Sequence, residues 1–220
     1  AVGDGAAGRS TLLVVLVSIW GLHLAGYLAR RNLGHGEDRR YTSMRKGHPN
    51  FVAWSLGGVF LLQAFLAWVV SLPVQLAMGD PTPRSVGWLG WVGVAVWAVG
   101  VVFESVGDLQ LARFKADPSS AGQVMDRGLW RYTRHPNYFG DALVWWGLFL
   151  VAAETGTAAW GVVGPIVMTI LLTRVSGKDL LERTIGRRRP GYAAYVERTS
   201  GFVPLPPRQV SGRSAGRPAG

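Results

Sequence analysis

Long uncharged apolar runs constrain this chain more than any other feature of its sequence. Three of them, Thr11–Ala29, Phe51–Met78 and Val86–Phe103, hold 19, 28 and 18 residues. Two shorter runs, Ala142–Ala153 and Ala158–Thr173, hold 12 and 16 residues. A helix needs about 20 residues, and at least about 17, to cross the ~30 Å hydrocarbon core of a bilayer. The first three runs therefore predict transmembrane helices, and the last two predict marginal spans that are tilted or shielded by neighbours.

Backbone polar groups inside a bilayer must pair within their own segment, so these runs predict an all-α, multi-pass transmembrane helical bundle. We expect residues 1–10 to form a polar flank, 11–207 a single membrane domain and 208–220 a disordered tail, because the tail is rich in Gly, Ser, Pro and Arg. The absence of cysteine excludes disulfides, zinc thiolate sites and a cysteine nucleophile. We expect no metal site.

The charges sort by position along the chain. The formal net charge is +10, and loops 30–50, 104–141 and 174–220 hold 21 of the 23 Lys and Arg residues. Alternating spans place these three loops on one side, which the positive-inside rule makes cytoplasmic. The excess of cations is then a topology signal, and nucleic acid is not an expected partner. We expect an integral membrane protein that contacts membrane lipids and is a monomer.

Two sets of polar residues follow apolar runs on the predicted cytoplasmic side. Glu104, Asp108 and Lys115 stand four and seven residues apart, so a helix continuing past the run would place them on one face. Arg174, Lys178 and Glu182 are spaced by four in the same way. Each set is either a solvated helix end or part of a site, because charged groups at membrane depth are functional candidates by default.

A third polar set precedes a predicted helix start. Arg131, Arg134 and His135 come just before Pro136, which suits the first turn of a helix beginning near Asn137. Cationic side chains beside a helix N-terminus favour phosphate. His135 is either structural or in contact with a ligand. Together the three sets predict a phosphate-bearing cofactor at the cytoplasmic face, in a helical membrane site, because the chain has no Walker or Rossmann motif.

The stretch at 128–141, GLWRYTRHPNYFGD, is the most specific motif of the chain, and RPGY at 189–192 and FVP at 202–204 follow it. These residues resemble the steroid 5-alpha-reductase-like family, closest to its bacterial branch of unassigned substrate. The resemblance runs from about residue 12 to 207. It implies a seven-helix membrane fold in which NADPH enters from the cytoplasm and reduces a C=C bond of an apolar lipid or steroid-like enone. With five runs and no initiator Met, this chain is expected to lack the family's first helices.

The resemblance also implies site residues. Asn137 stands at a cofactor-binding Asn of the family, and Asp141 replaces a Glu one turn later. Lys115 stands where an Arg contacts the cofactor phosphate, whereas Lys178 and Glu182 replace a His and a Tyr. The residues expected to bind NADPH are Glu104, Asp108, Lys115, Arg131, Arg134, His135, Asn137, Asp141, Arg174, Lys178 and Glu182.

The second run departs from the family. Steroid-reducing members carry a Gln-Glu pair there, in which the Glu faces the substrate ketone. This chain keeps Gln63 and has Ala64 in place of the acid. A donor at the carbonyl oxygen stabilises the charge that hydride addition creates. Gln63 is therefore the expected catalytic donor, with Tyr41 as a second candidate, or else the substrate is not a 3-keto steroid.

Two alternatives stay open. Arg-His-Pro-x-Tyr-x-Gly also occurs in isoprenylcysteine methyltransferase-like families, which bind S-adenosylmethionine, although their last helix usually carries a Glu-Glu pair that residues 178–182 lack. On the first alternative, the chain is a membrane methyltransferase that uses S-adenosylmethionine. The other alternative is a non-catalytic membrane protein of the same fold.

Overall fold

The structure is a computed structural model, and it describes residues 6–34, 39–82, 85–175, 182 and 189–209. Within this part of the chain the fold is all-helical and has no strand, which confirms the predicted fold class. The tail predicted at 208–220 lies largely outside the described residues. The chain divides into two compact units, residues 1–95 with 145–167 and residues 96–144 with 168–220.

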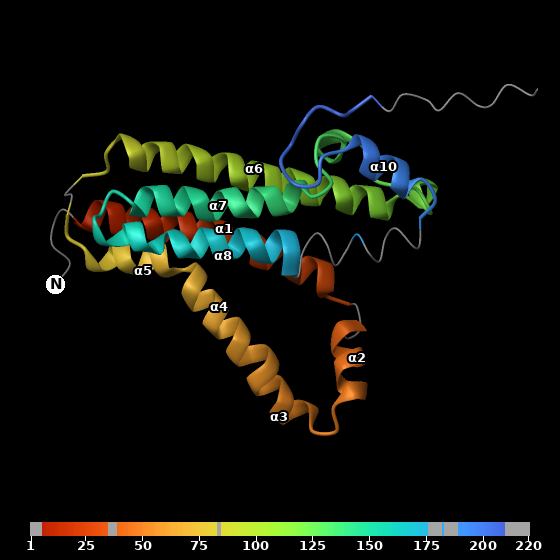
Figure 1. The fold of residues 1–220 in the computed structure, drawn as a ribbon, viewed down its shortest axis with the longest axis horizontal. Coiled ribbons are helices and arrows are strands. Elements are labelled where there is room, and N and C mark those ends of the chain that lie inside the picture. Colours follow the sequence, from red (N-terminus) through yellow and green to blue (C-terminus); the bar gives the residue numbers. More distant parts are fainter. Residues whose placement is uncertain (1–5, 35–38, 83–84, 176–181, 183–188, 210–220) are drawn as a thin grey trace, which may run out of the picture. The chain divides into compact units, whose positions relative to one another are not determined.

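The helices follow the apolar runs closely (Figure 1). Their bounds are α1 Ala6–Asn32, α2 Arg39–Gly47, α3 Phe51–Ser55, η1 Leu56–Leu61, α4 Leu62–Val70, α5 Leu72–Gly79, α6 Trp88–Ala116, η2 Pro118–Ser120, η3 Gly128–Arg131, α7 Pro136–Ala152, η4 Thr157–Val162, α8 Val163–Ile170, η5 Leu171–Val175 and α10 Tyr192–Arg198. Residues 6–10, predicted as a polar flank, are the first residues of α1.

Within the described part of the chain, four helical segments are long and apolar enough to cross a membrane. They are Gly8–Asn32, Phe51–Val70, Trp88–Ala116 and Thr157–Val175. The fourth predicted span, 142–153, coincides with most of α7, which is helical over only 17 residues. The run at 51–78 is not one straight helix either, because α4 ends at Val70 and α5 begins at Leu72, with Pro73 in its first turn. Proline suits a first helical turn and interrupts a helix interior, so the break falls beside it.

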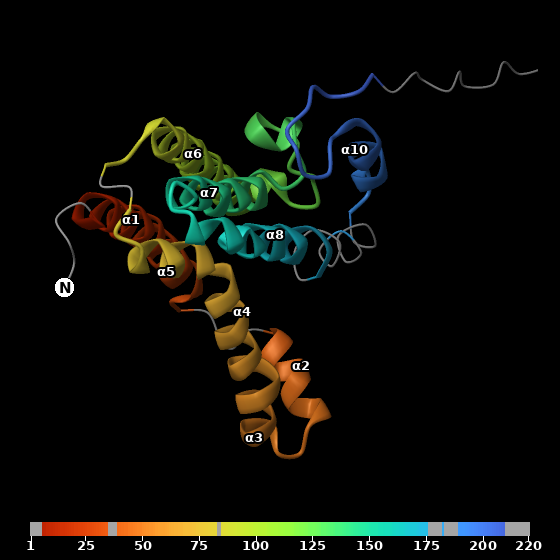
Figure 2. The same cartoon turned by 60° about the vertical axis from the view of Figure 1, so that its left-hand side comes forward.

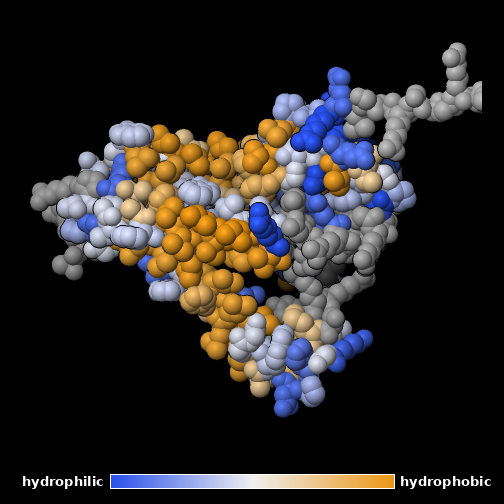
Figure 3. Space-filling view, viewed as in Figure 1, coloured by the Kyte–Doolittle hydropathy of each residue, from blue (hydrophilic) through white to orange (hydrophobic). Residues whose placement is uncertain are grey.

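In the first unit, α1 and α5 lie side by side (Figures 1 and 2). α5 also packs against η4 at glycine: a Cβ added to Gly161 would lie 2.7 Å from the Cα of Pro73. Small residues allow such close approach of helices in membranes. The segment Phe51–Val70 is different, because only 6% of its apolar window is buried. Figure 3 shows apolar residues over the visible face of α4, as expected of a helix that faces lipid.

In the second unit, α6 and α7 also approach through glycines. A Cβ added to Gly100 would lie 2.7 Å from the carbonyl oxygen of Gly140, and one added to Gly140 would overlap the backbone of Glu104. A Cβ on Gly107 would lie 3.1 Å from the backbone nitrogen of Asn137. These contacts bring the first turns of α7 against the turns of α6 that carry the acidic residues.

Candidate functional site

Two acidic side chains are buried on α6 where this helix runs past its apolar part. Glu104 and Asp108 are 4% and 6% exposed, and they lie one turn apart, as their spacing predicts. Asn137 on α7 donates from Nδ2 to Oδ1 of Asp108 at 2.9 Å. Burying ionisable groups in an apolar helix costs free energy unless they are paired, so such groups mark functional sites.

A third carboxylate joins them from α7. Asp141 stands one turn after Asn137 and interacts electrostatically with both Glu104 and Asp108. Its Oδ1 is buried and accepts no hydrogen bond from the described residues. Among those residues, no group of His, Asp and Glu side chains is arranged to hold a metal ion. The cluster therefore brings the carboxyl groups of three acidic side chains together between α6 and α7.

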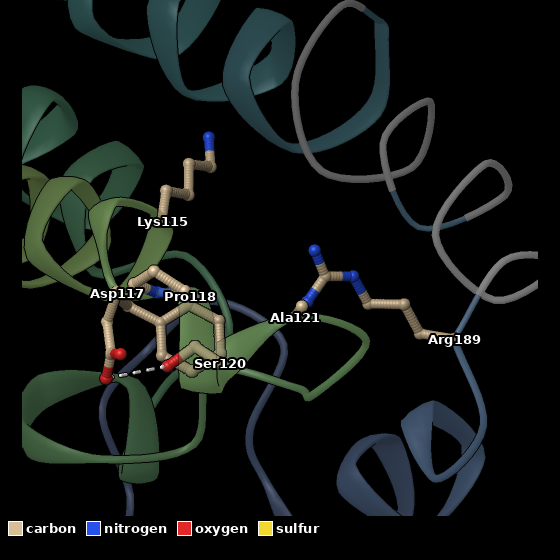
Figure 4. A pocket seen from close by; sticks show the side chains of 7 residues that line it. Lys115, Asp117, Pro118, Ser120, Ala121 and Arg189 are labelled. Atoms are coloured by element: carbon tan, nitrogen blue, oxygen red, sulfur yellow. Dashed lines mark hydrogen bonds between the residues drawn. The ribbon is translucent and has the colours of Figure 1, made fainter.

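A pocket opens where α6 ends. Its lining comes from Phe114, Lys115, Asp117, Pro118, Ser120, Ala121 and Arg189. Figure 4 shows the ammonium group of Lys115 and the guanidinium group of Arg189 on different sides of the pocket. Its volume is about 170 Å³, which is smaller than the roughly 300–1,000 Å³ of typical small-molecule sites. A pocket of this size suits a small anionic group such as a phosphate rather than a whole cofactor.

The Arg-His motif does not lie open to a ligand. Arg134 and His135 are 9% and 4% exposed. Glu182 accepts from Nε and Nη2 of Arg134 at 2.9 and 3.1 Å, and its Oε1 lies 3.0 Å from Nε2 of His135. Burial acts to raise the pKa of Glu182, but the hydrogen bonds and charges of His135 and Arg134 outweigh burial and lower this pKa to about 2. Glu182 is therefore ionised and paired at neutral pH.

The same loop anchors the C-terminal segment. Thr133 Oγ1 donates to the carbonyl oxygen of Phe202 at 2.7 Å, and Tyr195 Oη donates to that of Trp130 at 2.6 Å. Arg134 N donates to the carbonyl oxygen of Ser200 at 2.9 Å. Burial raises the pKa of Tyr195 above its usual range and raises that of Tyr192 to about 12, so both phenols stay neutral. Residues 128–135 thus also form the surface on which residues 192–202 pack.

The contacts described above do not include the other predicted residues. Arg131 is exposed at the last position of η3, and Arg174 is exposed in η5. Gln63 is exposed on α4 in the first unit, and the backbone of Tyr41 belongs to α2. Lys178 and the side chain of Tyr41 lie outside the described residues. Arg189 was not predicted as a site residue, although it lines the pocket and opens the RPGY motif at 189–192.

A family model described as "Protein of unknown function (DUF1295)" matches residues 1–199. The chain belongs to this family. A curated relative, the uncharacterized protein C594.04c of Schizosaccharomyces pombe, is 23% identical over 90% of this chain. The chain spans 64% of the length of that relative. No solved structure matches the chain.

Proposed function

We propose that this DUF1295 chain is a membrane-embedded reductase that uses NADPH to reduce a C=C bond in an apolar lipid or steroid-like enone. The observation that carries the proposal is the hydrogen-bonded Asn137–Asp108 pair between α6 and α7, with Glu104 buried one turn away. These positions are the ones that the resemblance to the steroid 5-alpha-reductase-like family assigns to the cofactor.

The donor set fits a nicotinamide dinucleotide phosphate. Lys115 and Arg189 supply cations at a phosphate-sized pocket. The buried Oδ1 of Asp141 is an acceptor for an amide N–H, which the nicotinamide carboxamide provides. When bound, NADPH supplies the hydride. Lys115 and Arg189 would hold its phosphates, Asp141 would bind its carboxamide, and α6 and α7 would keep water from the buried acidic groups.

The substrate side of the proposal uses the second apolar segment. Gln63 lies on α4 among exposed apolar side chains such as Phe60 and Phe65, which suit a substrate that enters from the bilayer. Its amide N–H donates to the carbonyl oxygen on which negative charge develops. Tyr41 remains the second candidate donor. The proposal places the cofactor residues on the cytoplasmic face.

The methyltransferase alternative keeps one specific observation in its favour. Glu104, Asp108 and Asp141 bring three acidic side chains together, and S-adenosylmethionine carries a cationic sulfonium that acidic side chains attract. The reductase is preferred because Lys115 and Arg189 suit the several phosphate charges of NADPH, which S-adenosylmethionine lacks.

Titration of NADPH and of S-adenosylmethionine into detergent-solubilised protein tests the proposal. We expect saturable binding of NADPH, weakened about tenfold or more in Asn137→Ala, because a ligand-orienting amide and the partner of Asp108 are both lost. Glu197→Gln, on an exposed glutamate of α10, is the matched control and should bind as the unmodified protein does. Binding of S-adenosylmethionine without NADPH would replace the reductase with the methyltransferase.

The proposed topology has its own test, since the chain has no native cysteine. Single cysteines at Lys115 and at Thr82, both exposed, should react with impermeant maleimide from opposite sides of the membrane. Labelling of both from one side would contradict the cytoplasmic placement.

A further inference from the structure

Most N–H donors of the Arg134 side chain form hydrogen bonds within the protein. Nε and Nη2 bind the two oxygens of Glu182, while Nη1 donates to the carbonyl oxygens of Val196 and Thr199 at 3.1 and 2.5 Å. All three guanidinium nitrogens are therefore engaged with the chain. Because these donors are used within the protein and the side chain is only 9% exposed, few N–H groups of Arg134 are available to a phosphate group.

The partners of Arg134 lie on both sides of Arg189 in the chain. Glu182 precedes Arg189, whereas Val196 in α10 and Thr199 just after α10 follow it. Arg189 is tied to α10, because its carbonyl oxygen accepts from the backbone nitrogen of Tyr192 at 3.3 Å. The turn between them needs a glycine, since Gly191 has φ of 83°.

Arg189 reaches the pocket from this tethered position. Its side chain lines the pocket that Lys115 also lines, and its Nη1 donates to the carbonyl oxygen of Gln123 (Figure 4). A guanidinium and an ammonium group at one small pocket attract a dianionic group such as a phosphate. Within the described residues, Arg189 is held through α10, because it bonds to Tyr192 and Arg134 binds Val196 and Thr199.

We propose that Arg134 is a positioning residue, with Glu182 as its partner, which holds the chain on both sides of Arg189 so that Arg189 and Lys115 bind the 2′-phosphate of NADPH together. This inference rests on the proposed function. It replaces the expectation that Arg134 and Glu182 themselves contact the cofactor. The 2′-phosphate distinguishes NADPH from NADH, so the ratio of the two affinities measures the role of Arg189 directly.

The test compares Glu182→Gln and Arg134→Lys with the control Glu197→Gln, which changes an exposed carboxylate of α10. Titration of each detergent-solubilised protein with NADPH and with NADH gives the affinity ratio. We expect both variants at the Arg134–Glu182 pair to lower NADPH affinity about tenfold and to leave NADH affinity unchanged, as Arg189→Gln does. An unchanged ratio in these variants, beside a lowered ratio in Arg189→Gln, would overturn the positioning role.

Hydrogen–deuterium exchange supplies a readout that needs no cofactor. Amides of residues 192–199 should exchange faster in Glu182→Gln than in the unmodified protein, and at the same rate in Glu197→Gln. If the unmodified protein binds neither NADPH nor NADH, the proposed function fails and exchange alone decides the tether. Unchanged exchange in Glu182→Gln would overturn the inference whatever the protein binds.

Discussion

Two regions of this chain carry polar side chains in opposite environments. On the segment Phe51–Val70, Gln63 is exposed on a helix whose other side chains are also mostly exposed and apolar. In the loop at 128–135, Thr133, Arg134 and His135 are buried and each has a protein partner. The first region presents its side chains outward, whereas the second pairs its polar side chains within the protein.

Removal of Arg134 is the largest expected disturbance of the buried region. Arg134→Leu leaves the Glu182 carboxylate and the Val196 and Thr199 carbonyls without their donor. Breaking a buried pair from one side costs roughly 3–5 kcal/mol, so a marked fall in the unfolding midpoint in detergent is expected. A midpoint equal to that of Glu197→Gln would mean that the two regions do not differ in this way.

Gln63 gives the complementary result in the exposed region. Under the proposed function, Gln63→Ala should remove about 2.7–4 kcal/mol of transition-state stabilisation, or 10²–10³ in rate, without loss of stability or of NADPH binding. Activity on 3-keto-4-ene steroids is expected to be weak, and Ala64→Glu should raise it. Vigorous steroid reduction that survives Gln63→Ala would show that the donor lies elsewhere.

The glycine contact between α6 and α7 tests packing behind the carboxylate cluster. Gly140→Ala places a Cβ against the backbone of Glu104, which must shift, at a cost of roughly 1–3 kcal/mol. Gly156→Ala is the matched control, because its Cβ meets nothing within 4 Å. Equal thermal stability of the two variants would contradict the close approach.

The Glu182 contacts predict a pH dependence. The pKa of Glu182 falls from 4.5 to about 2 in the folded chain, because the pairing with His135 and Arg134 outweighs burial. This carboxylate therefore contributes stability above pH 4.5 and loses that contribution as the pH falls from 4.5 through 2. Thermal unfolding across this window should show a shallower pH dependence in Glu182→Gln, and identical slopes would count against the pairing.

Two tryptophans make the smallest and most direct comparison. Trp68→Phe changes an exposed side chain on α4 and should alter stability by no more than about 0.5 kcal/mol. Trp130→Phe removes a buried donor whose Nε1 lies 3.0 Å from the carbonyl oxygen of Gly107, at a cost of about 1–3 kcal/mol. Similar unfolding midpoints for the two variants would contradict the predicted difference in stability between the two regions.

Much of the fold was readable from the sequence. Charge-free runs near or above the length of a bilayer crossing predict helices without any knowledge of neighbours, because each backbone group in lipid must pair within its own segment. The α6 continuation past residue 103 and the α7 start at Pro136 followed from helical spacing and from proline's preference for a first turn. The juxtaposition of Asp108 with Asn137 was expected only through the resemblance.

Which charges meet one another was decided by the tertiary structure. Arg134 and Glu182 are 48 residues apart and Arg134 and Thr199 are 65 apart, so no helical spacing relates them. A sequence shows that an arginine is present, but it does not show whether the guanidinium group faces a ligand or a carboxylate of its own chain. The tertiary structure pairs Arg134 with Glu182 and with the carbonyl oxygens of Val196 and Thr199, because a buried guanidinium group needs hydrogen-bond partners and the fold brings these distant residues to it.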